Sequence, residues 1–204
     1  MCQKVEQSKM REVLIEPSVE AMIKAGIIQE SEKELYLFGI QGLVLLLVNL
    51  ATTAAIGMLF GMLWQSFLFS AAYIPLRRYA GGYHAKTQAR CYCLSVLLIS
   101  GVLLMLKYVS FSVIAELIIL AVSAAVIFVK APVESVNKPL NVKEWQVFRL
   151  KARVILLTEI AASVILMGFS QEVALCIIMA VGSSGMMLIA VRRGGGVNNP
   201  ECVS

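Results

Sequence analysis

Long apolar runs, separated by short polar or basic breaks, dominate this chain from Leu35 onward. No residue in 35–76 carries a charge, and this run is too long for a single membrane helix of ~20 residues. Gly57 and Gly61 mark the natural break inside it. The pattern therefore predicts one helix over about 37–60 and a shorter helix over about 63–76.

Four further apolar segments follow, over about 92–109, 112–130, 153–170 and 173–191. The sequence thus predicts an all-α polytopic membrane protein with about six hydrophobic helical segments. Six true spans result if every segment crosses the bilayer. Four or five result if the shorter segments dip in without crossing.

The first 34 residues differ from the rest because charges alternate with apolar positions. They contain seven glutamates, four lysines and one arginine. Pro17 and a candidate N-cap at Ser18 precede apolar residues at helical spacing, namely Val19, Met22, Ile23 and Ile27. We expect one or two amphipathic helices at the membrane surface or against the bundle, and no secretory signal, because a cationic start with a short apolar core is missing.

Composition supports the membrane assignment. Apolar residues make up 59% of the chain and charged residues 15%, whereas about a quarter of a soluble domain is charged. We expect three regions: an amphipathic N-terminal region over 1–34, a membrane domain over 35–191 and a C-terminal tail over 192–204. No internal repeat or second soluble domain is visible.

Lysine and arginine gather in alternate connections. The 77–90 loop holds four cations and no acid, and the 130–153 stretch holds six cations with Glu134 and Glu144. The other turns hold Lys107 alone. With six spans, the positive-inside rule places both termini and both basic loops in the cytoplasm. The net charge of +5 also favours anionic membrane lipids. Nucleic acid is not an expected partner, because the basic loops flank membrane segments.

Several absences narrow the chemistry. The chain has no aspartate and one histidine, which excludes aspartate triads, diaspartyl proteases, phospho-aspartate pumps and multi-histidine metal sites. It has no Walker-type loop. Cys91-Tyr92-Cys93 has an unusual spacing for zinc, and His84 is the only imidazole. We therefore expect no metal and no cofactor.

The strongest candidate chemistry is a cysteine–histidine pair in the first basic loop. His84 is the only histidine, and Cys91 follows seven positions later. On a continuous helix the two would lie ~10 Å apart along the axis, too far for a hydrogen bond. The pair works only if the backbone bends between them. Gly81-Gly82 can supply a turn just before His84, and Cys91 would then begin the next helix, where the helix dipole favours a thiolate.

Nearby groups could serve such a pair. Arg77, Arg78, Gln88 or backbone amides, including those of Gly81 and Gly82, are candidates to hold an oxyanion or a substrate carboxylate. Simpler interpretations stay open: a cysteine that packs at a helix start, a solvated histidine, and arginines that only anchor the helices.

Two glutamates lie inside apolar segments, where an unpaired acid is costly. Glu159 is a candidate to orient His84 or to pair with an arginine. For Glu116 we favour an interhelical hydrogen bond. The small residues 182–185 suit close helix packing, either internal or in a dimer, and Cys176 is expected to be a packing residue.

The string Arg78-Tyr79-Ala80-Gly81-Gly82-Tyr83-His84-Ala85, followed by Cys91 and Ser95, resembles the signature of the accessory gene regulator B (AgrB) family. These are bacterial membrane cysteine endopeptidases that mature autoinducing peptides for quorum sensing. Residues 131–134 (Ala-Pro-Val-Glu) and 137–140 (Asn-Lys-Pro-Leu) resemble the family's second basic loop. The resemblance covers most of the chain.

The resemblance implies a multi-pass protein of the bacterial cell membrane. Its implied substrate is a small amphipathic, AgrD-like precursor peptide, cleaved near its C-terminal tail by Cys91 with His84 as base. The acyl-enzyme would then close a thiolactone or lactone ring. The family also allows a homodimer.

Two alternatives remain from the residues alone. A non-enzymatic peptide exporter or scaffold would use the glutamates as polar lining and the basic loops as docking sites, and it would tolerate the loss of Cys91. A lipid-modifying enzyme would bind a phosphate head group through the arginines, but such sites usually add acidic metal ligands or several histidines.

Overall fold

The computed structural model describes residues 16–81, 88–133 and 142–190, and the side chains of 88–91, 142 and 143 lie outside that description. The described residues form helices and no strand. In chain order these are α2 (Glu16–Lys24), the short 3-10 helix η2 (Glu30–Glu32), α3 (Lys33–Phe60), α4 (Leu63–Ala80), α5 (Gln88–Tyr108), α6 (Val113–Lys130), α7 (Val142–Met167) and α8 (Gln171–Ala190).

Each of the six predicted apolar segments corresponds to one helix, α3 to α8, which confirms the all-α fold. Four boundaries differ from the prediction by four residues or more. α3 begins at Lys33 rather than near 37, and α4 continues past Pro75 to Ala80. α5 begins at Gln88 rather than near 92, and α7 begins at Val142 rather than near 153. Hydropathy detects only the apolar part of a helix, so the charged end of each of these helices was missed.

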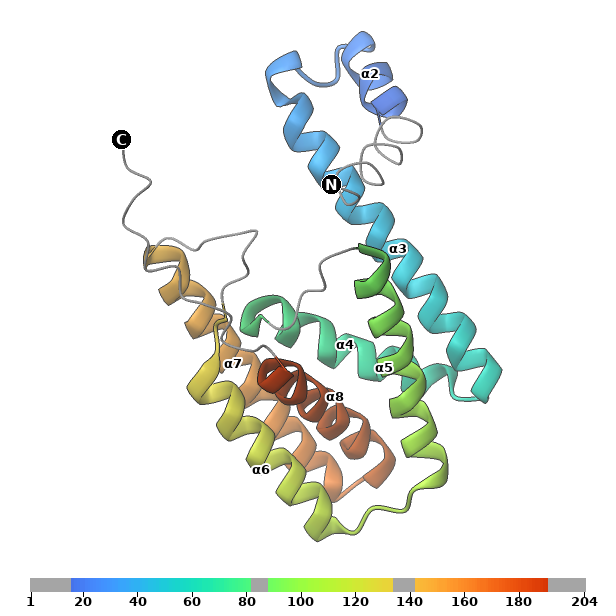
Figure 1. Cartoon of the computed structure of the whole chain (residues 1–204), viewed down its shortest axis with the longest axis vertical. Helices are drawn as coiled ribbons and strands as arrows, with labels where there is room; N and C mark the ends of the chain where they lie inside the picture. The colour runs from blue at the N-terminus through green and yellow to red at the C-terminus, as the bar shows by residue number, and fades with distance from the viewer. Residues whose placement is uncertain (1–15, 82–87, 134–141, 191–204) are drawn as a thin grey trace.

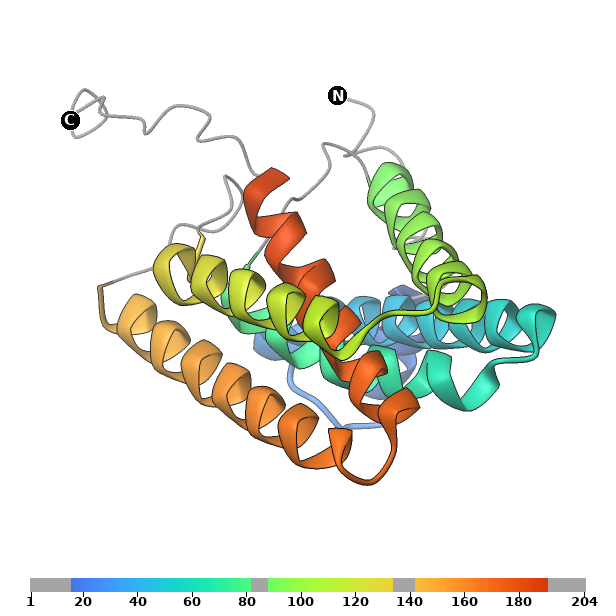
Figure 2. The same cartoon turned by 90° about the horizontal axis from the view of Figure 1, so that it is seen from below.

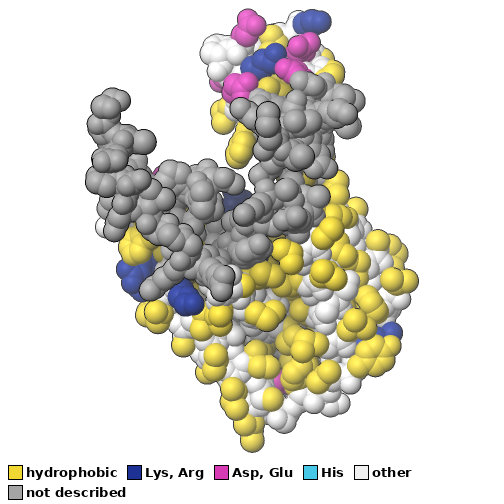
Figure 3. Space-filling model, viewed as in Figure 1, with side chains coloured by type: hydrophobic (Ala, Val, Ile, Leu, Met, Phe, Trp, Pro, Cys, Tyr) yellow, Lys and Arg dark blue, Asp and Glu magenta, His cyan; other side chains and the backbone are white. Residues whose placement is uncertain are grey.

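Within the described residues, three helical stretches are long and apolar enough to cross a membrane: Glu30–Phe60, Val113–Lys130 and Gln171–Ala190. The apolar part of α5, Tyr92–Tyr108, is shorter. Large apolar side chains cover the outer surface (Figure 3), and Phe38, Leu59 and Phe169 are 79%, 81% and 85% exposed. An apolar exterior of this kind suits a lipid environment.

Helix α8 is the centre of the bundle and packs against α4, α6 and α7 (Figures 1 and 2). Its most apolar stretch is 61% buried, against 11% for that of α3. Helix α3 contacts the bundle through α4 and also packs against α5. The peripheral position of α3 leaves much of its apolar surface exposed.

The small-residue patch 182–185 of α8 packs inside the molecule. A Cβ atom added to Gly185 would lie 3.0 Å from Cβ and 3.2 Å from Cα of Ser123 on α6. One added to Gly182 would lie 3.2 Å from Cγ2 of Ile119. The absence of these side chains lets the α6 and α8 backbones approach closely, so the internal alternative is the correct one.

The predicted break between the first two segments is confirmed. Gly61 ends α3 with a φ of 69°, in the left-handed conformation, and its N–H donates to the carbonyls of Gly57 and Met58. A Cβ atom at Gly57 would collide with the Ser66 hydroxyl of α4. The chain therefore turns tightly from α3 into α4.

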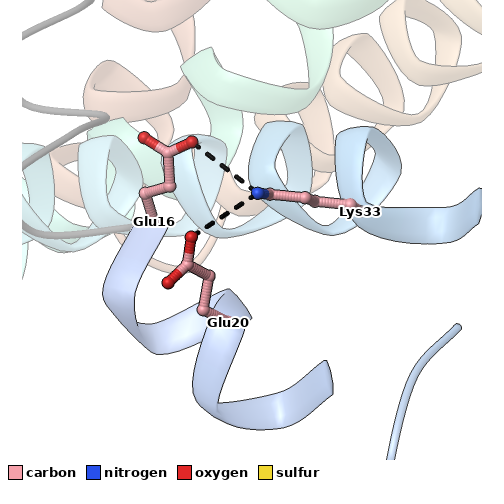
Figure 4. Close-up of polar contacts among 3 residues, drawn as sticks. All are labelled: Glu16, Glu20 and Lys33. Carbon is pink, nitrogen blue, oxygen red and sulfur yellow. Dashed lines mark ion pairs between the residues drawn. The ribbon is translucent and has the colours of Figure 1, made fainter. Parts of the chain in front are cut away.

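The N-terminal helix α2 folds back on α3. Val19, Ile28 and Leu37 are buried between them, and Lys33 Nζ lies 3.8 Å from Glu16 and 3.7 Å from Glu20 (Figure 4). The predicted amphipathic helix is thus confirmed. The N-cap at Ser18 is wrong, because Ser18 lies inside a helix already formed at Glu16.

Candidate functional site

The first basic loop leaves α4 at a glycine turn. Ala80 is the last residue of α4, and Gly81 caps it with φ 80° and ψ −161°. This combination of backbone angles is accessible almost only to glycine. It excludes a continuous helix from Arg77 to Cys91 and agrees with the glycine turn expected before His84, whereas the pairing of His84 with Cys91 stays a prediction. Gly82 and His84 lie outside the described residues.

Cys91 belongs to the first turns of α5, which begins at Gln88. This confirms the expectation that the cysteine stands at the start of the third apolar helix, although the Gln88 and Cys91 side chains lie outside the description. The neighbouring residue Tyr92 anchors this end of α5 to α3, because its hydroxyl lies 2.6 Å from Thr52 Oγ1.

The second basic stretch begins beside the first. The N–H of Val133 donates to the carbonyl of Ala80 at 3.1 Å, and a Cβ atom at Gly81 would collide with the Val133 carbonyl oxygen. Val133 follows α6 and a cis peptide between Ala131 and Pro132. Both basic loops therefore start from one backbone junction, formed by Ala80, Gly81 and Val133.

Helix α7 joins the same end of the molecule through Tyr79 of α4. The Tyr79 ring meets Phe148 edge-on, with centroids 5.5 Å apart, and Lys151 Nζ lies 5.2 Å from the Tyr79 centroid. Sequence reasoning missed Tyr79 as a contact residue, although it stands inside the motif that carried the family resemblance. The ends of α4 and α6 and the basic part of α7 thus meet at the point where the loop that contains the histidine begins.

The two candidate arginines on α4 differ in their surroundings. Arg77 Nη1 donates to the Tyr73 hydroxyl at 2.7 Å, and its guanidinium lies 5.6 Å from the Tyr73 centroid. Arg78 is exposed. Arg77 is held along its own helix, whereas Arg78 faces outward at the end that carries the loop.

The two buried glutamates have different roles in the packing. Glu116 is fully buried, and its Oε1 accepts a hydrogen bond of 3.0 Å from Gln171 Nε2, which joins α6 to α8. The predicted interhelical bond is confirmed. Glu159 is 9% exposed on the face of α7 that also buries Leu156 and Ser163. Its Oε2 has no hydrogen-bond partner, and no arginine in the described part of the chain pairs with it.

Two other cysteines lie in described helices. Cys176 is buried in α8, as expected of a packing residue, and Cys93 is exposed on α5. Cys2 and Cys202 lie outside the described residues. Within 16–81, 88–133 and 142–190, no group of three metal-ligating side chains comes together.

These features define the class: an α-helical membrane protein whose histidine-bearing loop begins where α4, α6 and α7 meet. The family model described as accessory gene regulator B matches residues 15–190. The chain therefore belongs to the AgrB family, as the motif resemblance predicted. It is a membrane protein linked to the processing of an autoinducing-peptide precursor in quorum sensing. No curated protein matches it, and no solved structure does.

Proposed function

We propose that this protein is a membrane cysteine endopeptidase. It cleaves a small amphipathic precursor peptide near its C-terminal tail and supports closure of the product into a thiolactone or lactone. The observation that carries the proposal is the position of Cys91 in the first turns of α5, directly after the segment with the only histidine. Both lie within the residues matched by the family model.

The surroundings of Cys91 favour its reactive form. A thiolate is the nucleophile, and it is stabilised by the N-terminal end of a helix and by nearby positive charge. Cys91 has both, since four cations and no acid occupy residues 77–90. His84 is the base that takes the thiol proton.

In the first step the Cys91 sulfur attacks a peptide carbonyl of the precursor. The C–N bond breaks, His84 protonates the departing amine, and the C-terminal tail leaves. The remaining peptide is bound to Cys91 as a thioester.

In the second step a thiol or hydroxyl of the precursor attacks this thioester. The ring closes and the Cys91 thiolate is released. Exchange of one thioester for another is nearly isoenergetic, so thiolactone closure avoids the large free-energy loss of hydrolysis. A site at the membrane interface keeps water from the intermediate.

Further residues support the two steps. Arg77, Arg78 and Gln88 are candidates to bind the oxyanion or a substrate carboxylate, and the backbone amides of Gly81 and Gly82 are alternatives. Glu159 is the candidate to orient His84, because its Oε2 is buried without a partner. Glu159 lies three positions after Leu156, so both side chains are on the buried side of α7.

We place the site and both termini on the cytoplasmic side, from the distribution of lysine and arginine. The precursor's amphipathic part would lie on the same membrane face, and its acidic tail would be attracted by the basic loops.

A cleavage assay in membranes tests the proposal, with the precursor peptide encoded beside this protein as substrate. Cys91→Ala and His84→Ala are each expected to abolish release of the C-terminal tail, at expression equal to the wild type. Cys93→Ala is the matched control, because it removes an exposed thiol two positions away on the same helix. It is expected to keep activity.

Mass spectrometry of the product and of trapped enzyme separates the steps. A mass increase on Cys91 equal to the truncated precursor is the expected acyl-enzyme. If Cys91→Ala still releases the tail, the cysteine mechanism is wrong and a scaffold or exporter role replaces it.

A further inference from the structure

Two arginines of α7 lie against aromatic rings at the end of the molecule where α6 and α7 meet. The Arg149 guanidinium carbon lies 4.9 Å from the Trp145 centroid, and that of Arg153 lies 4.1 Å from the centroid of Phe128 on α6. Arg149 and Arg153 are four positions apart, so they share one face of α7. We call these four residues the arginine–aromatic cluster.

The guanidinium groups have unused hydrogen-bonding capacity. The Nε atoms of Arg149 and Arg153 are both buried without a hydrogen-bond partner. No acidic side chain in the described part of the chain pairs with either arginine, and stacking on a ring does not use the N–H donors. Neither guanidinium is neutralised by a carboxylate of a described residue, so the cluster is suited to an anion that accepts hydrogen bonds from the terminal N–H groups of the two arginines.

The cluster lies at the boundary between polar and apolar parts of the helices. In α7, residues 142–153 contain Lys143, Arg149, Lys151 and Arg153, whereas Glu159 is the only charged residue in 154–167. Lys130 ends α6 close to Phe128. Helices in a membrane place such a boundary at the level of the lipid head groups.

Exposed apolar side chains neighbour the cations along α6 and α7. Val129, Leu150, Val154 and Leu157 are 78%, 65%, 51% and 59% exposed. Figure 3 shows Lys and Arg side chains next to apolar surface at this end of the molecule. A ligand that pairs with the arginines while contacting this surface carries both a negative charge and a hydrocarbon chain.

We propose that the arginine–aromatic cluster binds the phosphate of an anionic phospholipid. The guanidinium groups of Arg149 and Arg153 donate to the phosphate oxygens, a geometry in which arginine binds phosphate through paired N–H donors. The acyl chains lie along the exposed apolar residues of α6 and α7. An acidic peptide from solution fits less well, because the surface beside the arginines is apolar.

The test uses the intrinsic fluorescence of Trp145. The chain has two tryptophans, so Trp64→Phe leaves Trp145 as the only reporter. The Trp64→Phe variant is reconstituted in phosphatidylcholine vesicles that contain a small fraction of lipid with brominated chains. Brominated phosphatidylglycerol is expected to quench Trp145 more strongly than brominated phosphatidylcholine. Each arginine should raise the affinity for phosphatidylglycerol over phosphatidylcholine about fivefold, which is the usual contribution of one cation near an anionic membrane.

Arg149→Gln with Arg153→Gln should make the two lipids quench equally. Lys24→Gln with Lys107→Gln removes the same charge elsewhere, in α2 and at the C-terminal end of α5, and should keep the preference. Replacing both arginines by lysine should keep part of it, because lysine retains the charge and lacks the planar pair of donors.

Three results would overturn the proposal. In the protein with intact arginines, both lipids could quench Trp145 equally. The preference for phosphatidylglycerol could survive the double glutamine variant, or inorganic phosphate or a short soluble glutamate-rich peptide could abolish it. The readout involves no cleavage, so its outcome is separate from that of the proposed peptidase activity.

Discussion

At the scale of single residues, the candidate site depends on a glycine that no other residue can replace without strain. Gly81 ends α4 at a φ of 80° and touches the backbone of Val133. The backbone that leads to His84 and the backbone that leads into the second basic loop are fixed to each other at this point. The motif contains two adjacent glycines, but only the structure shows which contact makes the first one necessary.

Gly81→Ala is expected to lower stability and peptide cleavage together. The side chain would occupy a backbone region that costs about 1–3 kcal/mol for a residue other than glycine, and its Cβ would collide with the Val133 carbonyl. Thermal unfolding in detergent and the cleavage assay measure the two effects.

Gly101→Ala is the matched control, because Gly101 lies in α5 with open space around it. It should be neutral or stabilising by about 0.5–1 kcal/mol, as expected for alanine in a helix. If Gly81→Ala behaved like Gly101→Ala, the junction with Val133 would not constrain the loop.

At the scale of helices, the central position of α8 organises the bundle. It contacts α4, α6 and α7, and its small residues allow α6 to approach closely at Ser123. The hydrogen bond from Gln171 to Glu116 joins the same two helices near their N-terminal ends. Close backbone contact and one buried hydrogen bond together fix α6 against α8.

Gly185→Ala should destabilise the protein by about 1–3 kcal/mol, the usual range for adding volume to a packed interior. Its Cβ would lie 3.0 Å from that of Ser123. Adding Ser123→Gly should recover part of the loss, with a coupling of about 0.5–3 kcal/mol between the two positions. Denaturation of the single and double variants measures this coupling.

Gly42→Ala on α3 is the control, since nothing lies within 4 Å of a Cβ atom there. If Gly185→Ala and Gly42→Ala changed the free energy of unfolding equally, the close contact between α6 and α8 would be refuted.

At the scale of the whole molecule, the basic residues and the helix ends support one orientation in the membrane. The C-terminal ends of α4 and α6 and the basic part of α7 meet, and they carry most of the cations in the connections. At the α5–α6 connection the only cation is Lys107, in the last turn of α5. From the positive-inside rule we propose that the first group lies in the cytoplasm and the α5–α6 turn outside.

Cysteine labelling in intact cells checks this orientation. In a background whose five cysteines are replaced by alanine, Val109→Cys in the α5–α6 turn should react with a membrane-impermeant maleimide added outside. Glu144→Cys at the start of α7 should react only after lysis. Both positions are exposed, so burial does not explain a difference, and the reverse pattern would contradict the orientation.

The sequence by itself determined the all-helical fold, the six apolar segments, the amphipathic N-terminal helix and the family. Hydropathy and helical spacing are local properties, and a motif is a string of neighbours, so both can be read along the chain. The start of α7 was not predicted from the sequence, because hydropathy does not detect a basic amphipathic stretch as part of a membrane helix. His84 and Cys91 were identified from residue type and spacing, and their roles stay a prediction.

Only the tertiary structure decided which segments meet. The contact of Val133 with Ala80 and Gly81, the stacking of Arg153 on Phe128 and the internal packing of Gly185 join residues far apart in the chain. The physical reason is that such contacts depend on how six helices share one interior. Spacing gives the face on which a side chain lies, but only the packed bundle gives the partner on the other side.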